Sequence, residues 1–424
     1  MISWLFLAVS LVGAGFTVNA FLPARRAGPL YLPSFFASWL TIELAAHHLA
    51  WQALATGGFV VAGALRAWPG EVGFVITLVS WAGLLALWSE GRRSERAMRR
   101  ELGPLLSSGA RPRVPLWRRV TPFPFRSARV RRTNGVEFAR VGGQRLRLDV
   151  YEPREPGARR PAVLQIHGGA WILGDKKTQG VPLLTHLAAS GWVCFNVNYR
   201  LSPAATFPDH LVDLKRALAW IREHAATYGV DPRFIAVTGG SAGGHLTALM
   251  ALTENEPRYQ PGFEEADTSV QAAVPFYGIY DFSPETSRLP RAFYRRVLEP
   301  WVMKAFAADE PERFREASPI AHVRADAPPF LVLHGDRDTL APLAGARRFV
   351  DALRARSRAP VRYVELAGAQ HAFDVFPSPR SVPVIEGVER FLSATRAAAR
   401  DAAVESGRQS GEAVRAHEAA APAA

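Results

Sequence analysis

The chain of 424 residues has one cysteine and no recognisable metal-binding motif, and both scarcities restrict its chemistry. Cys194 has no second cysteine with which to form an internal disulfide, so the fold needs no oxidising compartment. No His-Glu-x-x-His motif occurs, and we expect neither a metal nor another cofactor. Positive charge is abundant instead, since 51 lysines and arginines outnumber 38 acidic residues.

The excess positive charge is concentrated in one segment. Residues 90–133 contain thirteen arginines and three glutamates, which accounts for +10 of the formal net charge of +13. Trp117, Phe123 and Phe125 are interleaved with the arginines, a pattern also found in nucleic-acid binding. Because an apolar stretch precedes this segment, we expect it to contact anionic lipid headgroups and no nucleic acid. A merely solvated linker is the remaining alternative.

The residues before this segment are mostly apolar, which predicts a transmembrane helical region at 1–89. Ile2 to Leu22 is uncharged and long enough to cross a bilayer, and Val72 to Trp88 is a further apolar run. Leu30 to Leu65 is too long for one short helix and too short for two, so we expect about three spans. A secretory signal peptide cut after Ala20 is the rival for the first span, but its start lacks lysine and arginine.

The distribution of arginine predicts the orientation of these spans. Arg25 and Arg26 follow the first span, whereas the second loop has only Arg66 and Glu71. Basic residues accumulate on the cytoplasmic side of membranes. We therefore expect a multi-pass protein of the cell (inner) membrane, with residues 90–139 as a basic juxtamembrane linker to a cytoplasmic domain.

Glu43 and His47 lie four residues apart on one face of the middle apolar stretch. Ionisable side chains at membrane depth are candidates for function. We favour the alternative that they form a hydrogen-bonded pair, which holds helices together or lies near the membrane interface.

From residue 140 onward, short apolar runs alternate with helical patterns. Several runs are continuously apolar, which is typical of parallel strands covered on both faces. The alternation predicts a doubly wound α/β domain at 140–395, with its site at the carboxyl ends of the strands. The strand-like runs are Leu146–Tyr151, Ala162–His167, Trp192–Tyr199, Phe234–Thr238, Val270–Phe276, Phe330–His334 and Val361–Leu366.

Two segments depart from this alternation. Residues 278–322 contain scattered aromatic residues, which predict an insertion: either a lid that binds an acyl chain or a helical excursion with a small core. Residues 396–424 are rich in alanine and lack a hydrophobic period, which predicts a disordered tail, with at most a frayed helix at its start.

A serine nucleophile is predicted by Gly239-Gly240-Ser241-Ala242-Gly243-Gly244, which lies between a buried strand and a helix. A tight strand-to-helix turn crowds the backbone, so glycines must flank the serine. A serine hydroxyl needs an imidazole to take its proton, and the imidazole needs a carboxylate to orient it. His371 and one of Asp336 and Asp338 follow later strands, in the order expected for an α/β-hydrolase.

An oxyanion site is predicted by His167-Gly168-Gly169-Ala170-Trp171, which follows another apolar strand. Consecutive glycines leave backbone N–H groups free to point at a ligand. The N–H groups of Gly168 and Gly169, with that of Ala242, are the candidate donors to a tetrahedral oxyanion.

With these motifs the sequence resembles the hormone-sensitive-lipase-like branch of the α/β-hydrolases, the alpha/beta hydrolase-3 family, over roughly residues 140–395. The resemblance implies an α/β-hydrolase fold with Ser241 as nucleophile, Asp338 as acid and His371 as base. Asp338 is preferred because the family's acid usually opens the turn after His-Gly-x-x. Many members have a third glycine where this chain has Ala170. Further supporting motifs are Asn198-Tyr199-Arg200-Leu201-Ser202-Pro203, Phe207-Pro208 and Gly229-Val230-Asp231-Pro232.

These observations predict a membrane-anchored serine carboxylesterase or lipase that needs no cofactor. The resemblance implies short- to medium-chain esters, and the bilayer tether favours lipophilic ones. An arylformamidase-like amide or formamide hydrolase, or an acyltransferase, would use the same three residues. A catalytically silent membrane scaffold is the alternative from a different class. No particular oligomeric state is predicted.

Overall fold

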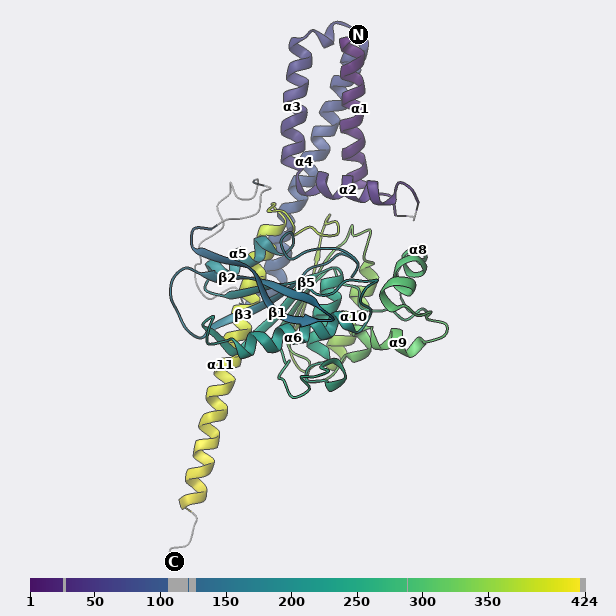
Figure 1. Cartoon of the computed structure of the whole chain (residues 1–424). Helices are drawn as coiled ribbons and strands as arrows, with labels where there is room; N and C mark the ends of the chain where they lie inside the picture. The colour runs from purple at the N-terminus through teal and green to yellow at the C-terminus, as the bar shows by residue number, and fades with distance from the viewer. Residues whose placement is uncertain (26–27, 106–120, 122–126, 288, 420–424) are drawn as a thin grey trace, which may run out of the picture.

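The computed structural model describes residues 1–25, 28–105, 121, 127–287 and 289–419. Apolar helices form an upright bundle over an α/β domain, and a long C-terminal helix extends away on the opposite side (Figure 1).

An eight-stranded sheet with the order β1-β2-β4-β3-β5-β6-β7-β8 forms the centre of the α/β domain. β1 pairs with β2 and β2 with β4 in antiparallel fashion, whereas all later neighbours are parallel. The mostly apolar strands β3, β4 and β6 are buried almost throughout, as parallel strands covered on both faces must be. The predicted α/β-hydrolase fold is confirmed. The strands are β1 (Val130–Val141), β2 (Gln144–Pro153), β3 (Arg160–Ile166), β4 (Val193–Val197), β5 (Val230–Gly240), β6 (Ala272–Phe276), β7 (Phe330–Gly335) and β8 (Val361–Leu366).

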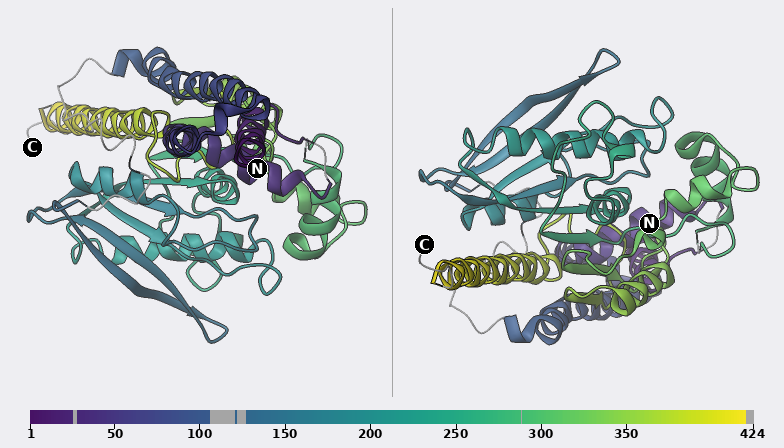
Figure 2. Two further views of the ribbon diagram at one scale, coloured as in Figure 1. Left: turned by 90° about the horizontal axis from the view of Figure 1, so that it is seen from above. Right: turned by 90° about the horizontal axis from the view of Figure 1, so that it is seen from below.

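Helices cover both faces of this sheet (Figure 2). α6 (Asp209–Glu223), α7 (Ala242–Leu252) and α10 (Leu343–Arg356) bury apolar side chains in one core. α5 (Val181–Ala189) and α11 (Ser381–Ala419) contribute to the core on the other face. The strand ends between these two layers are therefore held rigidly.

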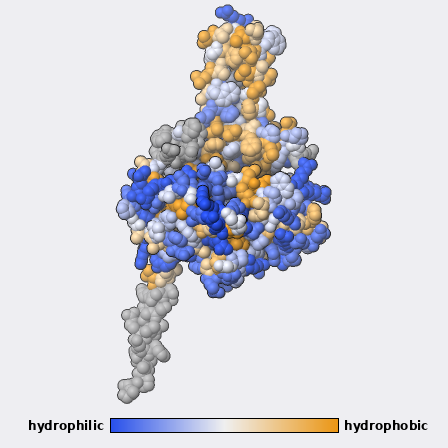
Figure 3. Space-filling model, viewed as in Figure 1, coloured by the Kyte–Doolittle hydropathy of each residue, from blue (hydrophilic) through white to orange (hydrophobic). Residues whose placement is uncertain are grey.

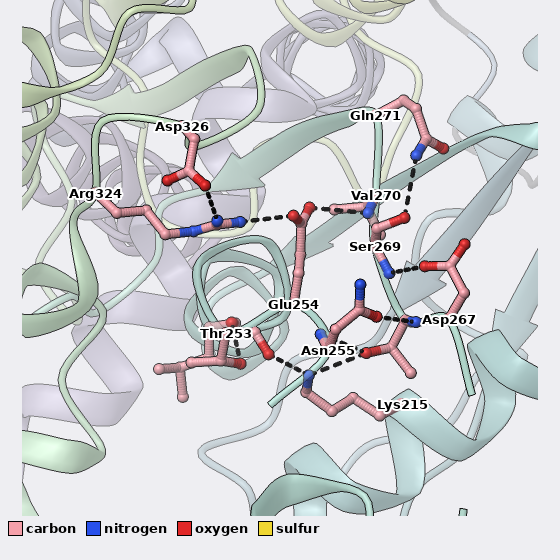
Figure 4. Close-up of polar contacts among 12 residues, drawn as sticks. Lys215, Thr253, Glu254, Asn255, Asp267, Ser269, Val270, Gln271, Arg324 and Asp326 are labelled. Carbon is pink, nitrogen blue, oxygen red and sulfur yellow. Dashed lines mark hydrogen bonds and ion pairs between the residues drawn. The ribbon is translucent and has the colours of Figure 1, made fainter. Parts of the chain in front are cut away.

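A buried polar network fixes the C-terminal end of α7 (Figure 4). The ammonium group of Lys215, on α6, donates hydrogen bonds to the carbonyl oxygen of Thr253 and to Thr268 Oγ1. Glu254 accepts the backbone N–H of Val270 at 2.9 Å and pairs with Arg324 at 2.6 Å. This network joins α7 to the segment that enters β6.

The predicted insertion lies between β6 and β7. Phe314 is fully buried beneath Tyr294, whereas Trp301 and Phe306 are 44% and 62% exposed. The segment therefore has a small core of its own and also presents aromatic side chains to the outside. Its elements are α8 (Arg291–Phe293), the π-helix η5 (Tyr294–Met303), α9 (Pro311–Glu316) and the 3₁₀ turn η6 (Pro319–His322).

The middle stretch of the N-terminal region, which we expected to be too short for two helices, forms two. Among the described helices, α1 (Ile2–Phe21) and α4 (Trp68–Leu102) are long and apolar enough to cross a membrane by length and composition. The middle stretch divides at Leu44 into α2 (Tyr31–Glu43) and α3 (Ala45–Val61). Only α3 stands beside α1 and α4, while α2 lies across the foot of the bundle (Figure 1).

The predicted linker at 90–139 begins as a continuation of α4, which runs to Leu102. Met98 and Leu102, four residues apart, are buried in the core beneath the sheet, where α4 packs on α11 and β8. Glu90 pairs with Arg337 at 3.0 Å. Trp117, Phe123 and Phe125 lie outside the described residues. Short 3₁₀ turns are η1 (Ala64–Arg66), η2 (Gly103–Leu105) and η4 (Pro257–Tyr259).

The tail also differs from its prediction, because α11 continues as a helix through Ala419. Alanine, arginine and glutamate are strong helix formers, so the composition sustains a helix that lacks an apolar face. Residues 420–424 lie outside the described part of the chain.

Candidate active site

Ser241 occupies a sharp turn between β5 and α7. Its backbone has φ +60° and ψ −121°, a conformation that non-glycine residues rarely adopt and that is common at functional turns. The Ser241 N–H donates to the carbonyl oxygen of Phe276, on the neighbouring strand, at 3.0 Å. At Gly243 an added Cβ would lie 2.2 Å from the carbonyl oxygen of Ile166, so only glycine permits this packing.

Asp338 and His371 are in direct contact. His371 Nδ1 lies 2.7 Å from Asp338 Oδ2, and both side chains are almost fully buried. The other oxygen, Asp338 Oδ1, accepts the backbone N–H groups of Leu340 and Ala341, each at 2.8 Å. These bonds fix the carboxylate so that it orients the imidazole ring, as a catalytic acid would.

A second histidine also contacts this carboxylate. His334 Nε2 lies 3.4 Å from Asp338 Oδ2, a contact that the sequence analysis missed. Burial alone would raise the pKa of Asp338, but the charges and hydrogen bonds of His371 and His334 outweigh it and lower this pKa. The Asp338 carboxylate therefore stays ionised well into the acid range.

Asp336, the other aspartate in the turn, has a different partner. Its Oδ1 accepts the backbone N–H of Gly368 at 2.7 Å. It thereby ties the turn after β7 to the loop after β8, and the carboxylate that meets His371 is that of Asp338.

Tyr277, directly after β6, lies between the serine turn and His371. Its ring centroid is 4.6 Å from that of His371, and its hydroxyl donates to the buried carboxyl of Asp374. A Cβ added at Gly240 would come within 2.6 Å of the Tyr277 hydroxyl. Among the described residues the Ser241 hydroxyl has no hydrogen-bond partner; without substrate such catalytic bonds are often long or poorly aligned.

One predicted oxyanion donor is already occupied. The Gly168 N–H donates to Gln179 Oε1 at 2.7 Å, which corrects its expected role. Gly169 has φ +122°, and a Cβ there would lie 2.0 Å from the carbonyl oxygen of Leu173. Ala170 follows with φ +53°, and Ala242 is the first residue of α7, where N–H groups lack helical partners. The amides left for an anion are those of Gly169, Ala170 and Ala242.

Two further side chains hold this glycine loop in place. Trp171 is buried, and its Nε1 donates to His245 Nδ1 at 3.2 Å. His245, on α7, stacks on Phe282 from the insertion at 4.6 Å. The oxyanion loop, the serine helix and the insertion thus meet in one cluster. Within the described ranges no group of three or more metal-ligating side chains is assembled.

Glu43 does not pair with His47, contrary to the interpretation we favoured. Its Oε1 lies 3.0 Å from Arg380 Nε, and its Oε2 accepts the hydroxyl of Ser378 at 2.7 Å. Both partners follow β8 in the α/β domain. The sequence could not reveal this because more than 330 residues separate the groups.

Comparisons with known proteins agree with this architecture. A family model described as BD-FAE matches residues 148–353. "Probable carboxylic ester hydrolase LipM" of Mycobacterium tuberculosis (strain ATCC 25618 / H37Rv) is 43% identical over 91% of this chain and 92% of that protein. "Esterase LipQ" of the same strain is 47% identical over 59% of this chain and 60% of its own length.

A solved structure adds to these relatives. A thermophilic esterase, Est2 of Thermogutta terrifontis, was solved with butyrate bound. It superposes with a TM-score of 0.53 at 28% identity and covers 61% of this chain and 92% of its own. The matched proteins bear out the predicted family.

Proposed function

This chain belongs to the carboxylic ester hydrolases of the alpha/beta hydrolase-3 type, and we propose that it works through an acyl-enzyme on Ser241. The Ser241 hydroxyl attacks the ester carbonyl while His371 takes its proton. His371 then protonates the departing alcohol and afterwards activates the water that releases the acid. The contact between His371 and the doubly held carboxylate of Asp338 carries this proposal.

The oxyanion that forms in each step would accept hydrogen bonds from the backbone N–H groups of Gly169, Ala170 and Ala242. Such donors act without reorganisation because the backbone already fixes them. The positive φ of Gly169 and Ala170 turns this loop back on itself beside the serine turn. Ala170 thus adopts the left-handed conformation that glycine favours, with φ +53°.

We expect a preference for acyl chains shorter than about ten carbons. The solved relative bound to butyrate supports short acyl groups. The measurement is turnover of p-nitrophenyl esters from acetate to palmitate by the full-length protein in detergent. N-formylkynurenine and an added alcohol acceptor are tested beside them. Faster cleavage of N-formylkynurenine, or dominant transfer to the alcohol, would contradict the ester-hydrolase proposal.

We also propose that α1, α3 and α4 anchor the enzyme in the cell membrane. Polar side chains lie inside this bundle: Thr17 and Ser80 are hydrogen-bonded at 2.8 Å, as are Thr77 and Ser10 at 3.0 Å. Large apolar side chains face outward, and the bundle surface is largely hydrophobic (Figure 3). Polar and small residues inside with apolar residues outside are typical of helices packed in lipid. The α/β domain and basic segment 90–133 would then face the cytoplasm and its anionic lipids.

The orientation can be tested by cysteine labelling, because the native Cys194 is buried. We expect Arg66→Cys, between α3 and α4, to react with a membrane-impermeant maleimide on intact cells. Arg25→Cys, in the loop that follows α1, should react only after lysis. Labelling of Arg25→Cys on intact cells would contradict the proposed orientation.

A further inference from the structure

Helix α2, which ends 87 residues before β1, touches both loops that carry Asp338 and His371. The hydroxyl of Tyr31 donates to the carbonyl oxygen of Thr339, directly after Asp338. Trp39 Nε1 donates at 2.9 Å to the carbonyl oxygen of Ala372, directly after His371. Each contact therefore holds the backbone one residue beyond a group of the candidate site.

Two more residues on the same face of α2 continue this contact. The ring of Phe35 lies edge-on to the imidazole of His371, with centroids 6.3 Å apart. Glu43 forms the buried ion pair with Arg380 and accepts the hydroxyl of Ser378. Tyr31, Phe35, Trp39 and Glu43 recur at every fourth position, so they form one stripe along the helix.

The last of these contacts returns to the loop that carries His371. Arg380, itself buried, donates from Nη1 to the carbonyl oxygen of Ala367, which directly follows β8. A buried guanidinium group needs a charged partner, and Glu43 supplies it. The His371 loop is thus held on both sides, at Ala372 by Trp39 and at Ala367 through Glu43 and Arg380.

We propose that this stripe of α2 positions the Asp338 turn and the His371 loop, so that the N-terminal region completes the active site. The inference rests on the proposed function of Ser241, Asp338 and His371. Small displacements of catalytic groups strongly reduce turnover, so the backbone contacts of α2 should act on kcat. The alternative is that the stripe only lines the substrate-binding site and contacts the acyl chain.

The test removes single hydrogen bonds and keeps the rings. Trp39→Phe and Tyr31→Phe each delete one donor, and a net hydrogen bond corresponds to about a 3- to 10-fold effect. We expect kcat to fall by about that factor in each variant, with KM and the melting temperature nearly unchanged. The full-length protein in detergent is assayed with acetate, butyrate and octanoate esters. Glu43 is left intact, since its removal would leave the Arg380 charge buried without a partner.

Trp51→Phe is the matched control, because Trp51 on α3 donates to His48 and not to a loop of the site. Its kcat should equal that of the wild type. A fall in the kcat of the α2 variants that is the same for all three esters supports the positioning role. Unchanged kcat in the α2 variants, an equal fall in kcat in Trp51→Phe, or a rise in KM that grows with acyl length would overturn the inference. A wild type that cleaves no ester would instead contradict the proposed function.

Discussion

Ser241→Ala should lower kcat/KM for p-nitrophenyl butyrate by at least about 10³-fold, since triad residues act as a unit. In the proposed mechanism the Ser241 hydroxyl supplies the oxygen that bonds to the acyl carbon, and alanine has no atom to replace it. Labelling by a fluorophosphonate probe should disappear in the same variant. Both measurements use the full-length protein, with its melting temperature as a check on folding.

Ser190→Ala provides the matched control for this loss. Ser190 is an exposed serine that follows α5, outside the candidate site, and its replacement should leave activity and labelling unchanged. If Ser241→Ala keeps more than a tenth of the activity, or if the probe still labels it, the nucleophile is a different residue.

Asp338→Asn should lower kcat by about 10⁴-fold, because an amide stabilises the wrong tautomer of its histidine partner. The volume of the side chain barely changes, so the loss reports the charge that faces His371 Nδ1 at 2.7 Å. Asp336→Asn is the matched control, since Asp336 binds the backbone N–H of Gly368 and not His371. A larger fall in kcat in Asp336→Asn than in Asp338→Asn would show that Asp336, and not Asp338, is the acid of the site.

Wild type and Asp338→Asn should also differ in the pH dependence of their stability. The pKa of Asp338 is lowered in the folded chain, because its histidine partners outweigh the effect of burial. The contribution of this carboxylate to the free energy of unfolding is then fully present above the unfolded pKa of about 3.9. It is lost as the pH falls through the lower pKa of the folded chain. The difference in unfolding free energy between wild type and Asp338→Asn should therefore be fully developed just above that unfolded pKa and vanish in strong acid. A constant difference would show that the carboxylate charge does not stabilise the fold.

Local signals were sufficient for seven of the eight strands and for the loops at the sheet edge, but they missed β1, which begins inside the predicted linker at 90–139. Continuous apolar runs marked the strands, and glycine patterns marked the serine turn at Ser241. The predictions were wrong where a residue's hydrogen-bond or ion-pair partner is distant in the chain. Nothing near Gly168 indicates that Gln179 takes its amide, and nothing near Glu43 indicates Arg380. The prediction also placed Met98 and Leu102 in a linker, because they follow a charged stretch. Both residues are in fact buried in the core of the α/β domain.

The sequence by itself determined the α/β-hydrolase domain and the residue types of its site, because strand periodicity and tight turns are local properties of the chain. Tertiary structure alone decided which atoms meet: the two oxygens of Asp338, the amides left free for an anion, and the stripe of α2 on the His371 loop. Such contacts join segments as much as 337 residues apart. Their geometry follows from how helices and strands pack, which no local pattern encodes.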